Sequence, residues 1–568
     1  MVRYLSRRLL LTSAVASALL AACGPAADST PPVAPAQPAA ARPAESKPAA
    51  TKPAEKPRGG DQIVFSVTGT PLTLNPAFSA VSDTIYFSQF FFDGLTRPDD
   101  SLQPAPSLAE SWTVSPDGLN YTFNLRGGVK FHDGKELTSA DVKFTWELIS
   151  HPANKTGAQL YGFFSRIKGA ADYRAEKAPE IVGIQTPDPR TVKVELTSVY
   201  APFLSISAFQ SILPKHIYGA VPVEQLDKHE LARKPVGTGP FKLVELKDNQ
   251  HVLLDANTGY WGGRPKVDRL VLKVVADATV LPSLLRSGEV DVIGLYRGLP
   301  VLDYAAFAKD PAFKIVDLAA QTNWYVEFNL TNPLFQDARV RQAIIRATDR
   351  RGIVEHLLLG HGRVVDTVIH PISWGYSERP VKYEYDLEAA KRLFAEAGWK
   401  PGSDGVLTKD GKRFGFELIT FMPEYPEILQ EQWKKLGLDV QLKRADFSAV
   451  WAPVYLAKKH DVIALHQPMG IYADPDYPLT GYYSSRLNRN TYNNPRVDEI
   501  IVKATGTTDQ AERKKAYAEL NEILATDAPH MWIAMPDEIW THNTKVRLPD
   551  KKLGFLMLTN VKDWERIG

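Results

Sequence analysis

The sequence has little cysteine, no excess of charge of either sign and no long hydrophobic run. Cys23 is the only cysteine among 568 residues, so no disulfide can form within the chain. Lys and Arg number 67 against 65 for Asp and Glu, a net charge of +2. This balance excludes the basic surface that binds nucleic acid through its phosphates. The apolar run over residues 9–22 is shorter than the ~20 residues that a membrane-spanning helix needs.

Motifs that carry common enzyme chemistry are also missing. The sequence contains no G-x-S-x-G nucleophile turn, no H-E-x-x-H zinc motif and no G-x-x-x-x-G-K phosphate loop. The 12 histidines are scattered, so neither a metal site nor a cofactor is expected. Asp474 and Asp476 in "YADPDYP" form the best acid/base pair, and a secreted hydrolase that uses them is an alternative. We expect a protein that is not an enzyme.

The N-terminus has the pattern of an export signal. Arg3, Arg7 and Arg8 precede the apolar run, which ends in "LAAC" at Cys23. These last four residues resemble the bacterial lipobox, which implies that residues 1–22 are a signal peptide and that Cys23 is lipidated. "SRRLLL" also resembles a twin-arginine signal, so the export route stays open. The alternative is an ordinary buried cysteine behind an uncleaved anchor.

A segment rich in proline and alanine follows the cysteine. Residues 24–60 contain almost no side chain large enough to build a core. We therefore expect residues 23–60 to be a lipidated cysteine and a disordered linker with polyproline II character, reaching at most roughly 110 Å at ~3.1 Å per residue. A lipid at one end and a folded body at the other would tether the protein to the outside of a membrane.

The rest of the chain mixes strand and helix patterns. "QIVFSVTG", which begins at Gln62, predicts a strand, and the turn "SPDG" between two alternating segments predicts a hairpin. Thr138 and Asp141 fit a capping box, and Asp337 fits a helix N-cap. Gly288 is placed to end another helix. These patterns indicate an α/β protein with more than one domain.

A series of longer blocks carries a family resemblance. Together they resemble, in the family's order, the extracytoplasmic solute-binding proteins of ABC importers in the peptide/nickel class, family 5. They are "FDGLTR", "LAESWTVSPDGLNYTFNLRGGVKFHDGKELTSADVKFTWE", "GTGPFKLVE", "YWGGRPKVDRL", "LRSGEVDV", "DARVRQAIIRATDRRGIV" and "YDLEAAKRLFAEAGW". Most residues in the blocks have a structural explanation. The blocks therefore indicate the fold and not the identity of the ligand.

The resemblance implies a two-lobed periplasmic-binding-protein-like fold of type II, in its large three-subdomain variety. Lobe I would comprise residues 61–320 plus 540–568, with an extra subdomain at about 106–214, and lobe II residues 322–537. Two crossing segments would connect the lobes, within "AAQTNWYVEFNLTN" and "MWIAMPDEIWTHN". A hinge there would let the lobes close over a ligand.

The resemblance also implies a ligand site, which would be lined by aromatic side chains more than by fixed charges. Peptide-binding members carry an acidic residue, three positions before an Asp-Pro or Glu-Pro pair, that binds the α-ammonium group of the peptide. Ile471 occupies that position here, so either a nearby carboxylate such as Asp474 replaces it or the ligand is no peptide with a free N-terminus. The full set of expected ligand-binding residues is Tyr86, Trp324, Tyr325, Trp374, Ile471, Tyr472, Asp474 and Tyr482.

The same resemblance implies the partners. The ligand would be a small solute, a peptide, a sugar or a chelated metal, delivered to an ABC permease and its ATPase. The membrane would be reached through the N-terminal lipid, no nucleic acid is expected, and the protein would be a monomer. An adhesion or scaffold lipoprotein is a further alternative, because it would explain the lipid and the linker equally well.

Overall fold

The computed structural model describes residues 61–79, 82–295, 298–319, 322–377, 382–422, 425–468, 474–485 and 490–567. The predicted signal peptide, Cys23 and the linker lie outside the described residues, as do Ile471 and Tyr472. The described ranges all belong to one unit of the chain, Gly59–Gly568.

The first large sheet is mixed and gathers strands from both ends of the described chain. The predicted strand that begins at Gln62 is confirmed as β1, which pairs in parallel with β10 and β11. The sheet order is β12 (Phe313–Leu318), β22 (Glu538–Asn543), β11 (Val292–Ile293), β1 (Gln62–Val67), β10 (Arg269–Val274), β9 (His251–Ala256) and β8 (Phe241–Lys247).

A second large sheet lies in the middle of the sequence. Its order is β14 (Gly362–Arg363), β21 (His530–Pro536), β13 (Thr322–Phe328), β20 (Val462–Pro468), β18 (Gly415–Thr420) and β19 (Asp439–Arg444). The strands β18 and β20 run parallel, and β13 runs antiparallel to β20. The carboxyl ends of β18 and β20 therefore meet the start of β13 at one edge of the sheet.

A four-stranded antiparallel sheet precedes the return to the first sheet. The predicted hairpin is confirmed, because Val114 pairs with Tyr121 and Trp112 with Phe123. The order is β4 (Ala109–Val114), β5 (Asn120–Leu125), β7 (Thr191–Glu195) and β6 (Ile184–Asp188). Smaller ribbons are formed by β2 (Thr96–Pro98) with β3 (Pro104–Pro106), β23 (Val546–Arg547) with β24 (Glu565–Arg566), and β15 (Lys400–Pro401), β16 (Leu407–Lys409) and β17 (Lys412–Arg413).

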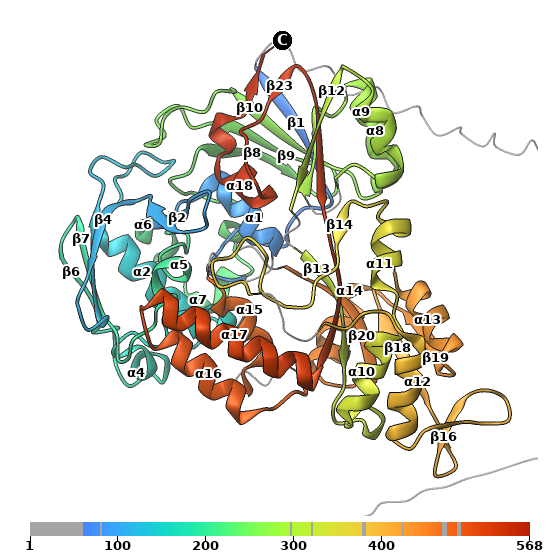
Figure 1. The fold of residues 1–568 in the computed structure, drawn as a ribbon. Helices are drawn as coiled ribbons and strands as arrows, with labels where there is room; N and C mark the ends of the chain where they lie inside the picture. The colour runs from blue at the N-terminus through green and yellow to red at the C-terminus, as the bar shows by residue number, and fades with distance from the viewer. Residues whose placement is uncertain are drawn as a thin grey trace, which may run out of the picture. The chain divides into compact units, whose positions relative to one another are not determined.

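The chain passes between the two large sheets twice. It leaves the first sheet after β12 and enters the second at β13, and it returns between β21 and β22 at Asp537, which Figure 1 shows as one long red path. We call residues 61–318 with 538–567 the first body, and residues 322–536 the second body. The four-stranded sheet belongs to the first body.

Helix ends follow the predicted caps. The Thr138 amide donates to Asp141 Oδ2 at 2.9 Å, and Asp337 Oδ1 accepts from the Arg339 amide at 2.9 Å. Gly288 ends its helix with φ +76°, a conformation that glycine adopts at little cost. The main helices of the first body are α1 (Ser82–Phe91), α2 (Ser139–Ser150), α3 (Ala158–Phe164), α4 (Ala170–Arg174), α8 (Leu281–Ser287), α9 (Tyr304–Ala308) and α18 (Gly554–Thr559).

Further helices cover the second sheet. They are α10 (Ala338–Arg346), α12 (Leu387–Glu396), α13 (Pro426–Lys435), α14 (Phe447–Val450), α15 (Asp476–Tyr483), α16 (Pro495–Thr505) and α17 (Gln510–Asp527). One hydrophobic cluster of the second body packs Val326 and Phe328 with α10 and α13, and another packs Tyr325 with α15, α16 and α17. The second sheet thus has a hydrophobic cluster on each face, as the alternating side chains of β13 require.

The blocks "FDGLTR", "GTGPFKLVE" and "YWGGRPKVDRL" meet at one half-buried carboxylate of the first body, that of Asp93. Asp93 accepts hydrogen bonds from Thr238 at 2.8 Å and from Tyr260 and Trp261 at 2.9 Å. A Cβ added at Gly237 would lie 2.0 Å from the Phe91 carbonyl oxygen, so this close approach requires glycine. These blocks therefore specify packing, as predicted from their sequence.

Candidate functional site

The carboxyl edge of β18 and β20 is the place where an open α/β sheet offers a site for a ligand. Met422 follows β18, and its Sδ lies 3.1 Å from Nδ1 of His466 on β20. His466 is paired with Trp324 across the two strands. Thioether, imidazole and indole groups thus lie at one edge, where β20 leads into residues 469–473.

A row of aromatic rings extends this edge toward the surface. Phe421 contacts His466 with ring centroids 5.6 Å apart and Phe447 at 5.3 Å. Phe447 stacks on Trp451 at 5.5 Å with an angle of 20° between the planes. Phe447 is 49% exposed, and Phe421, His466 and Trp451 are half-buried. These faces suit an apolar or planar group of a solute.

Asp474 begins the described chain after that edge and is held by α17. Its Oδ1 lies 2.6 Å from Arg513 Nη2 and its Oδ2 lies 2.9 Å from Arg513 Nη1, a bidentate ion pair. The two side chains are 3% and 6% exposed. Oδ1 also accepts from the Asp476 amide at 2.9 Å. Both carboxylate oxygens of Asp474 are therefore engaged inside the protein.

This ion pair bears on the hydrolase alternative. Arg513 occupies both oxygens of Asp474, and Asp476 accepts hydrogen bonds from Tyr200 and Thr480. Both aspartates are buried, at 3% and 2% exposure. An acid/base pair must reach a substrate and a water molecule, so this arrangement does not support catalysis by Asp474 and Asp476.

The structure brings three of the predicted ligand residues, Trp374, Tyr325 and Tyr482, into one hydrophobic cluster of the second body. Trp374 is half-buried beneath the Arg513 guanidinium, whose Cζ lies 4.8 Å from the ring centroid. Tyr325 and Tyr482 contact each other at 6.0 Å in the second body. Both are buried, at 0% and 6% exposure. Their contact with a ligand stays a prediction.

Two more predicted aromatic residues lie apart from this group. Trp324 is 7% exposed and stacks on Tyr425 with centroids 4.9 Å apart, at the carboxyl edge described above. Tyr86 is 1% exposed and packs against Phe555 at 5.8 Å, in the hydrophobic cluster of the first body. The structure therefore joins Trp374 to Asp474 through Arg513, and keeps Tyr86 in a different core.

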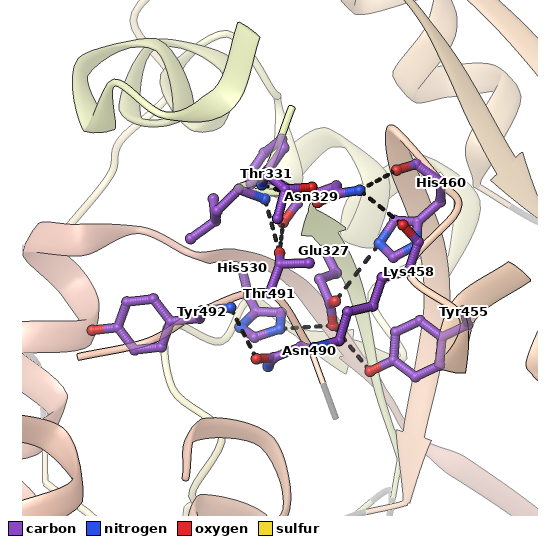
Figure 2. Close-up of polar contacts among 12 residues, drawn as sticks. Glu327, Asn329, Thr331, Tyr455, Lys458, His460, Asn490, Thr491, Tyr492 and His530 are labelled. Carbon is purple, nitrogen blue, oxygen red and sulfur yellow. Dashed lines mark hydrogen bonds and ion pairs between the residues drawn. The ribbon is translucent and has the colours of Figure 1, made fainter. Parts of the chain in front are cut away.

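The second body also contains a buried acidic and imidazole cluster, drawn in Figure 2. Glu327 Oε2 accepts from the Tyr455 hydroxyl at 3.0 Å and lies 3.1 Å from His530 Nε2, while Oε1 lies 3.7 Å from His460 Nε2. The side chains of Glu327, His460 and His530 are each at most 2% exposed. Burial alone would raise the pKa of Glu327, but His460 and His530 lower it to about 2.

Sequence reasoning missed Arg513, His466 and Phe447. A signal for Arg513 was present, because it lies on the buried stripe of α17 with Tyr517, Leu520 and Leu524. An arginine on such a stripe needs a buried anionic or hydrogen-bonding partner. No comparable signal marked the other two residues, because their role depends on strands that are distant in sequence.

Metal-binding groups of side chains and membrane-spanning helices are both absent from the described ranges. In that part of the chain no three His, Cys, Asp or Glu side chains are grouped so that they could hold a metal ion. No helix within the same ranges combines the length and the apolar character that crossing a bilayer requires.

Two α/β bodies connected by two crossing segments, with aromatic groups at the carboxyl edge of one sheet, define a two-lobed binding protein. The sequence profile described as "Bacterial extracellular solute-binding proteins, family 5 Middle" matches residues 103–490. The chain belongs to this family of extracellular solute-binding proteins. The predicted family and the predicted periplasmic-binding-protein fold are both confirmed.

Individual relatives agree with this assignment. The oligopeptide-binding protein AppA of Bacillus subtilis is 31% identical over 529 residues, 90% of this chain and 92% of its own. Its structure in complex with a nonapeptide has a TM-score of 0.74 and covers 90% of this chain and 100% of that one. Heme-binding protein A of Haemophilus influenzae is 30% identical over 518 residues, 85% of this chain and 88% of its own.

A metal-chelate complex belongs to the same group of solved structures. NikZ from Campylobacter jejuni in complex with Ni(L-His) is 28% identical, has a TM-score of 0.75 and covers 89% of this chain and 100% of that one. These relatives are substrate-binding proteins rather than enzymes. The chain is thus a substrate-binding component of an ABC importer, which passes a solute to a membrane permease.

Proposed function

We propose that the protein captures one small solute against the carboxyl edge of β18 and β20 and delivers it to an ABC permease. The proposal rests on membership of the family. The exposed ring of Phe447 and the half-buried rings of Phe421 and Trp451 indicate where the solute binds. The solute is a peptide or a molecule of similar size with apolar or planar groups. The ligands for which the relatives are named, a nonapeptide, heme and Ni(L-His), span this range of chemistry.

The solute is recognised without an ion pair between Asp474 and an α-ammonium group. Arg513 engages both oxygens of Asp474, and Ile471, which lies outside the described residues, carries no charge. A buried ammonium without a counter-charge would keep its desolvation cost and gain no charge-assisted bond. The ligand thus has no buried free N-terminus at this loop.

Titration with paired peptides tests this ligand chemistry. We expect N-acetylation of a bound peptide to change Kd less than about tenfold, equivalent to about 1.4 kcal/mol, because Arg513 already engages both oxygens of Asp474. The variant Ile471→Asp should make binding sensitive to acetylation. Calorimetry of both proteins with free and acetylated peptides, and with oligosaccharides of similar size, measures the difference. A loss of more than about a hundredfold on acetylation in the wild type would refute the proposal.

We further propose that Cys23 anchors the protein by a lipid and that residues 24–60 are its tether. The variant Cys23→Ala should move the protein from the membrane fraction to the soluble fraction, because the acyl chains supply the membrane affinity. Immunoblots of the two fractions measure this shift. As a matched control, a deletion of residues 30–55 should leave both the membrane fraction and solute affinity unchanged. If Cys23→Ala divides between the two fractions as the wild type does, Cys23 does not carry the lipid anchor.

A further inference from the structure

A buried asparagine near the start of β13 has no hydrogen-bond partner for its side chain. Asn323 is 0% exposed, and both the oxygen and the nitrogen of its side-chain amide are buried without a partner. Among the buried asparagines of the described ranges, it is the only one that leaves both amide atoms unused. Burying an amide without hydrogen bonds is costly, and native structures keep few such groups. The position of Asn323 therefore calls for a functional explanation.

Asn329, directly after β13, shows how a buried amide of the same segment is satisfied. Its Nδ2 donates to the His460 carbonyl at 2.7 Å and to the Lys458 carbonyl at 3.2 Å. Its Oδ1 accepts from the amide and the hydroxyl of Thr331, at 3.0 Å and 2.7 Å (Figure 2). Asn329 is 5% exposed, so the two asparagines are buried to a similar degree. Burial and residue type alone do not explain the missing partners of Asn323.

Asn323 lies at the edge end of the sheet face that carries aromatic groups of the site. Side chains alternate along β13, so Asn323 is on the same side of the sheet as Tyr325. Tyr325 belongs to the hydrophobic cluster against which Phe421 and Trp451 pack. Asn323 pairs with Gln467, near the carboxyl end of β20. This face thus combines aromatic rings with an unused amide at the carboxyl edge, a composition typical of a site for a small solute.

The unused amide indicates the chemistry of its partner. A side-chain amide accepts through its oxygen and donates through its nitrogen, so it can form both bonds with one complementary group. The backbone N–H and C=O of one residue in an extended peptide point to the same side, as in the hydrogen-bonded pairs of an antiparallel sheet. Such a residue offers a donor and an acceptor together. This pairing needs no charge on the solute, in agreement with the engagement of Asp474 by Arg513.

We propose that Asn323 is a recognition residue, which exchanges two hydrogen bonds with the backbone N–H and C=O of one residue of an extended peptide. This role rests on the proposed function and narrows its solute to a peptide that is recognised through its backbone and not through its N-terminus. The amide lacks partners in the protein without solute, and binding supplies them. The contact therefore favours the peptide over a molecule of the same shape that lacks the backbone N–H.

Paired peptide libraries test this contact in the full chain. One library contains short N-acetylated peptide amides, and the other contains the same sequences with one backbone N–H at a time replaced by an ester oxygen. Calorimetric competition should show that the wild type prefers peptide over ester by about tenfold at one position. Asn323→Leu, which has a similar shape and no polar side-chain atom, should bind the peptide about tenfold more weakly and should not distinguish it from the ester.

The stability of the solute-free protein separates recognition from a structural role. Asn323→Leu should keep or raise the urea midpoint of unfolding, because it removes an amide that has no partner. The matched control Asn329→Leu should lower the midpoint, because it removes an amide with four hydrogen bonds. The folded fraction of this control should still prefer peptide over ester as the wild type does. Asn323→Ala leaves more room for the solute and should also lose the preference, which keeps the test decisive if Asn323→Leu does not fold.

The outcomes that contradict the role of Asn323 differ from those that contradict the proposed function. A variant at Asn323 that prefers peptide over ester by the wild-type factor would overturn the recognition role. A lower urea midpoint for Asn323→Leu with unchanged peptide affinity would overturn it as well and would make Asn323 a structural residue. A wild type that binds oligosaccharides or chelated metals and none of the acetylated peptides would overturn the recognition role and leave the proposed function intact. A wild type that binds none of these solutes would overturn both.

Discussion

Replacing Arg513 by alanine should lower the free energy of unfolding by about 3–5 kcal/mol. The substitution leaves the Asp474 carboxylate, 3% exposed, without its bidentate partner and removes the bond from Arg513 to the Tyr517 hydroxyl. The large effect is the cost of an unpaired buried charge, and it exceeds the net stabilisation that the pair provides. Urea unfolding of wild type and variant measures it.

Two further variants separate this explanation from a general weakening of α17. In the control Arg496→Ala, the lost pair with Glu519 joins side chains that are 55% and 42% exposed, and the cost should stay below about 1 kcal/mol. The double variant Asp474→Asn with Arg513→Met removes both charges and should recover most of the loss. A cost for Arg513→Ala no greater than that of the surface control would contradict the role of the ion pair.

Replacing Glu327 by glutamine should change how stability depends on acid. In the wild type His460 and His530 lower the pKa of Glu327 from 4.5 to about 2. A group with a lowered pKa contributes stability that is fully present above pH 4.5 and is lost as pH falls toward about 2. The contribution is about 3 kcal/mol, since each unit of pKa is worth about 1.4 kcal/mol.

Unfolding titrations from pH 7 to pH 2 test this linkage. Glu327→Gln should be less stable than the wild type by about 3 kcal/mol at neutral pH, and the two curves should converge near pH 2. Glu519→Gln, at an exposed ion pair, should follow the wild-type curve at all pH values within about 1 kcal/mol. Parallel curves for Glu327→Gln and the wild type would show that the imidazole cluster does not hold the carboxylate in its ionised form.

Local features of the fold could be predicted from the sequence because they depend on neighbouring residues. The capping pair of Thr138 and Asp141 spans three positions, and the glycine at 288 ends its helix within one turn. The hairpin of β4 and β5 is set by a four-residue turn and two alternating segments. Each of these features depends on a few neighbouring residues, so the sequence predicted it correctly.

The interactions that define the site connect residues far apart in the chain. Arg513 and Asp474 are 39 positions apart, Glu327 and His530 are 203 apart, and Tyr200 and Asp476 are 276 apart. No local pattern states which of these side chains will meet. Asp474 illustrates the consequence, because the sequence marked it as a carboxylate available to a ligand and only the fold shows its partner.

The family resemblance predicted more of the fold than the local patterns did, because it relates blocks that are distant in the sequence and that the fold brings together. Three of the blocks meet at Asp93, where their side chains form one partly buried hydrogen-bond network. The resemblance could not give the ligand, because relatives that share the fold are named for different ligands, an oligopeptide, heme and Ni(L-His).

Capture of a solute can be observed by native mass spectrometry. The protein is purified without denaturation and then incubated with mixed peptides, oligosaccharides and chelated metals. We expect a species with the mass of the chain plus one solute. This species should be lost on unfolding and reduced when Phe447→Ala and Trp451→Ala remove two aromatic rings of the site. A spectrum that shows the chain alone under all of these conditions would contradict the assignment of this protein as the solute-binding component of an importer.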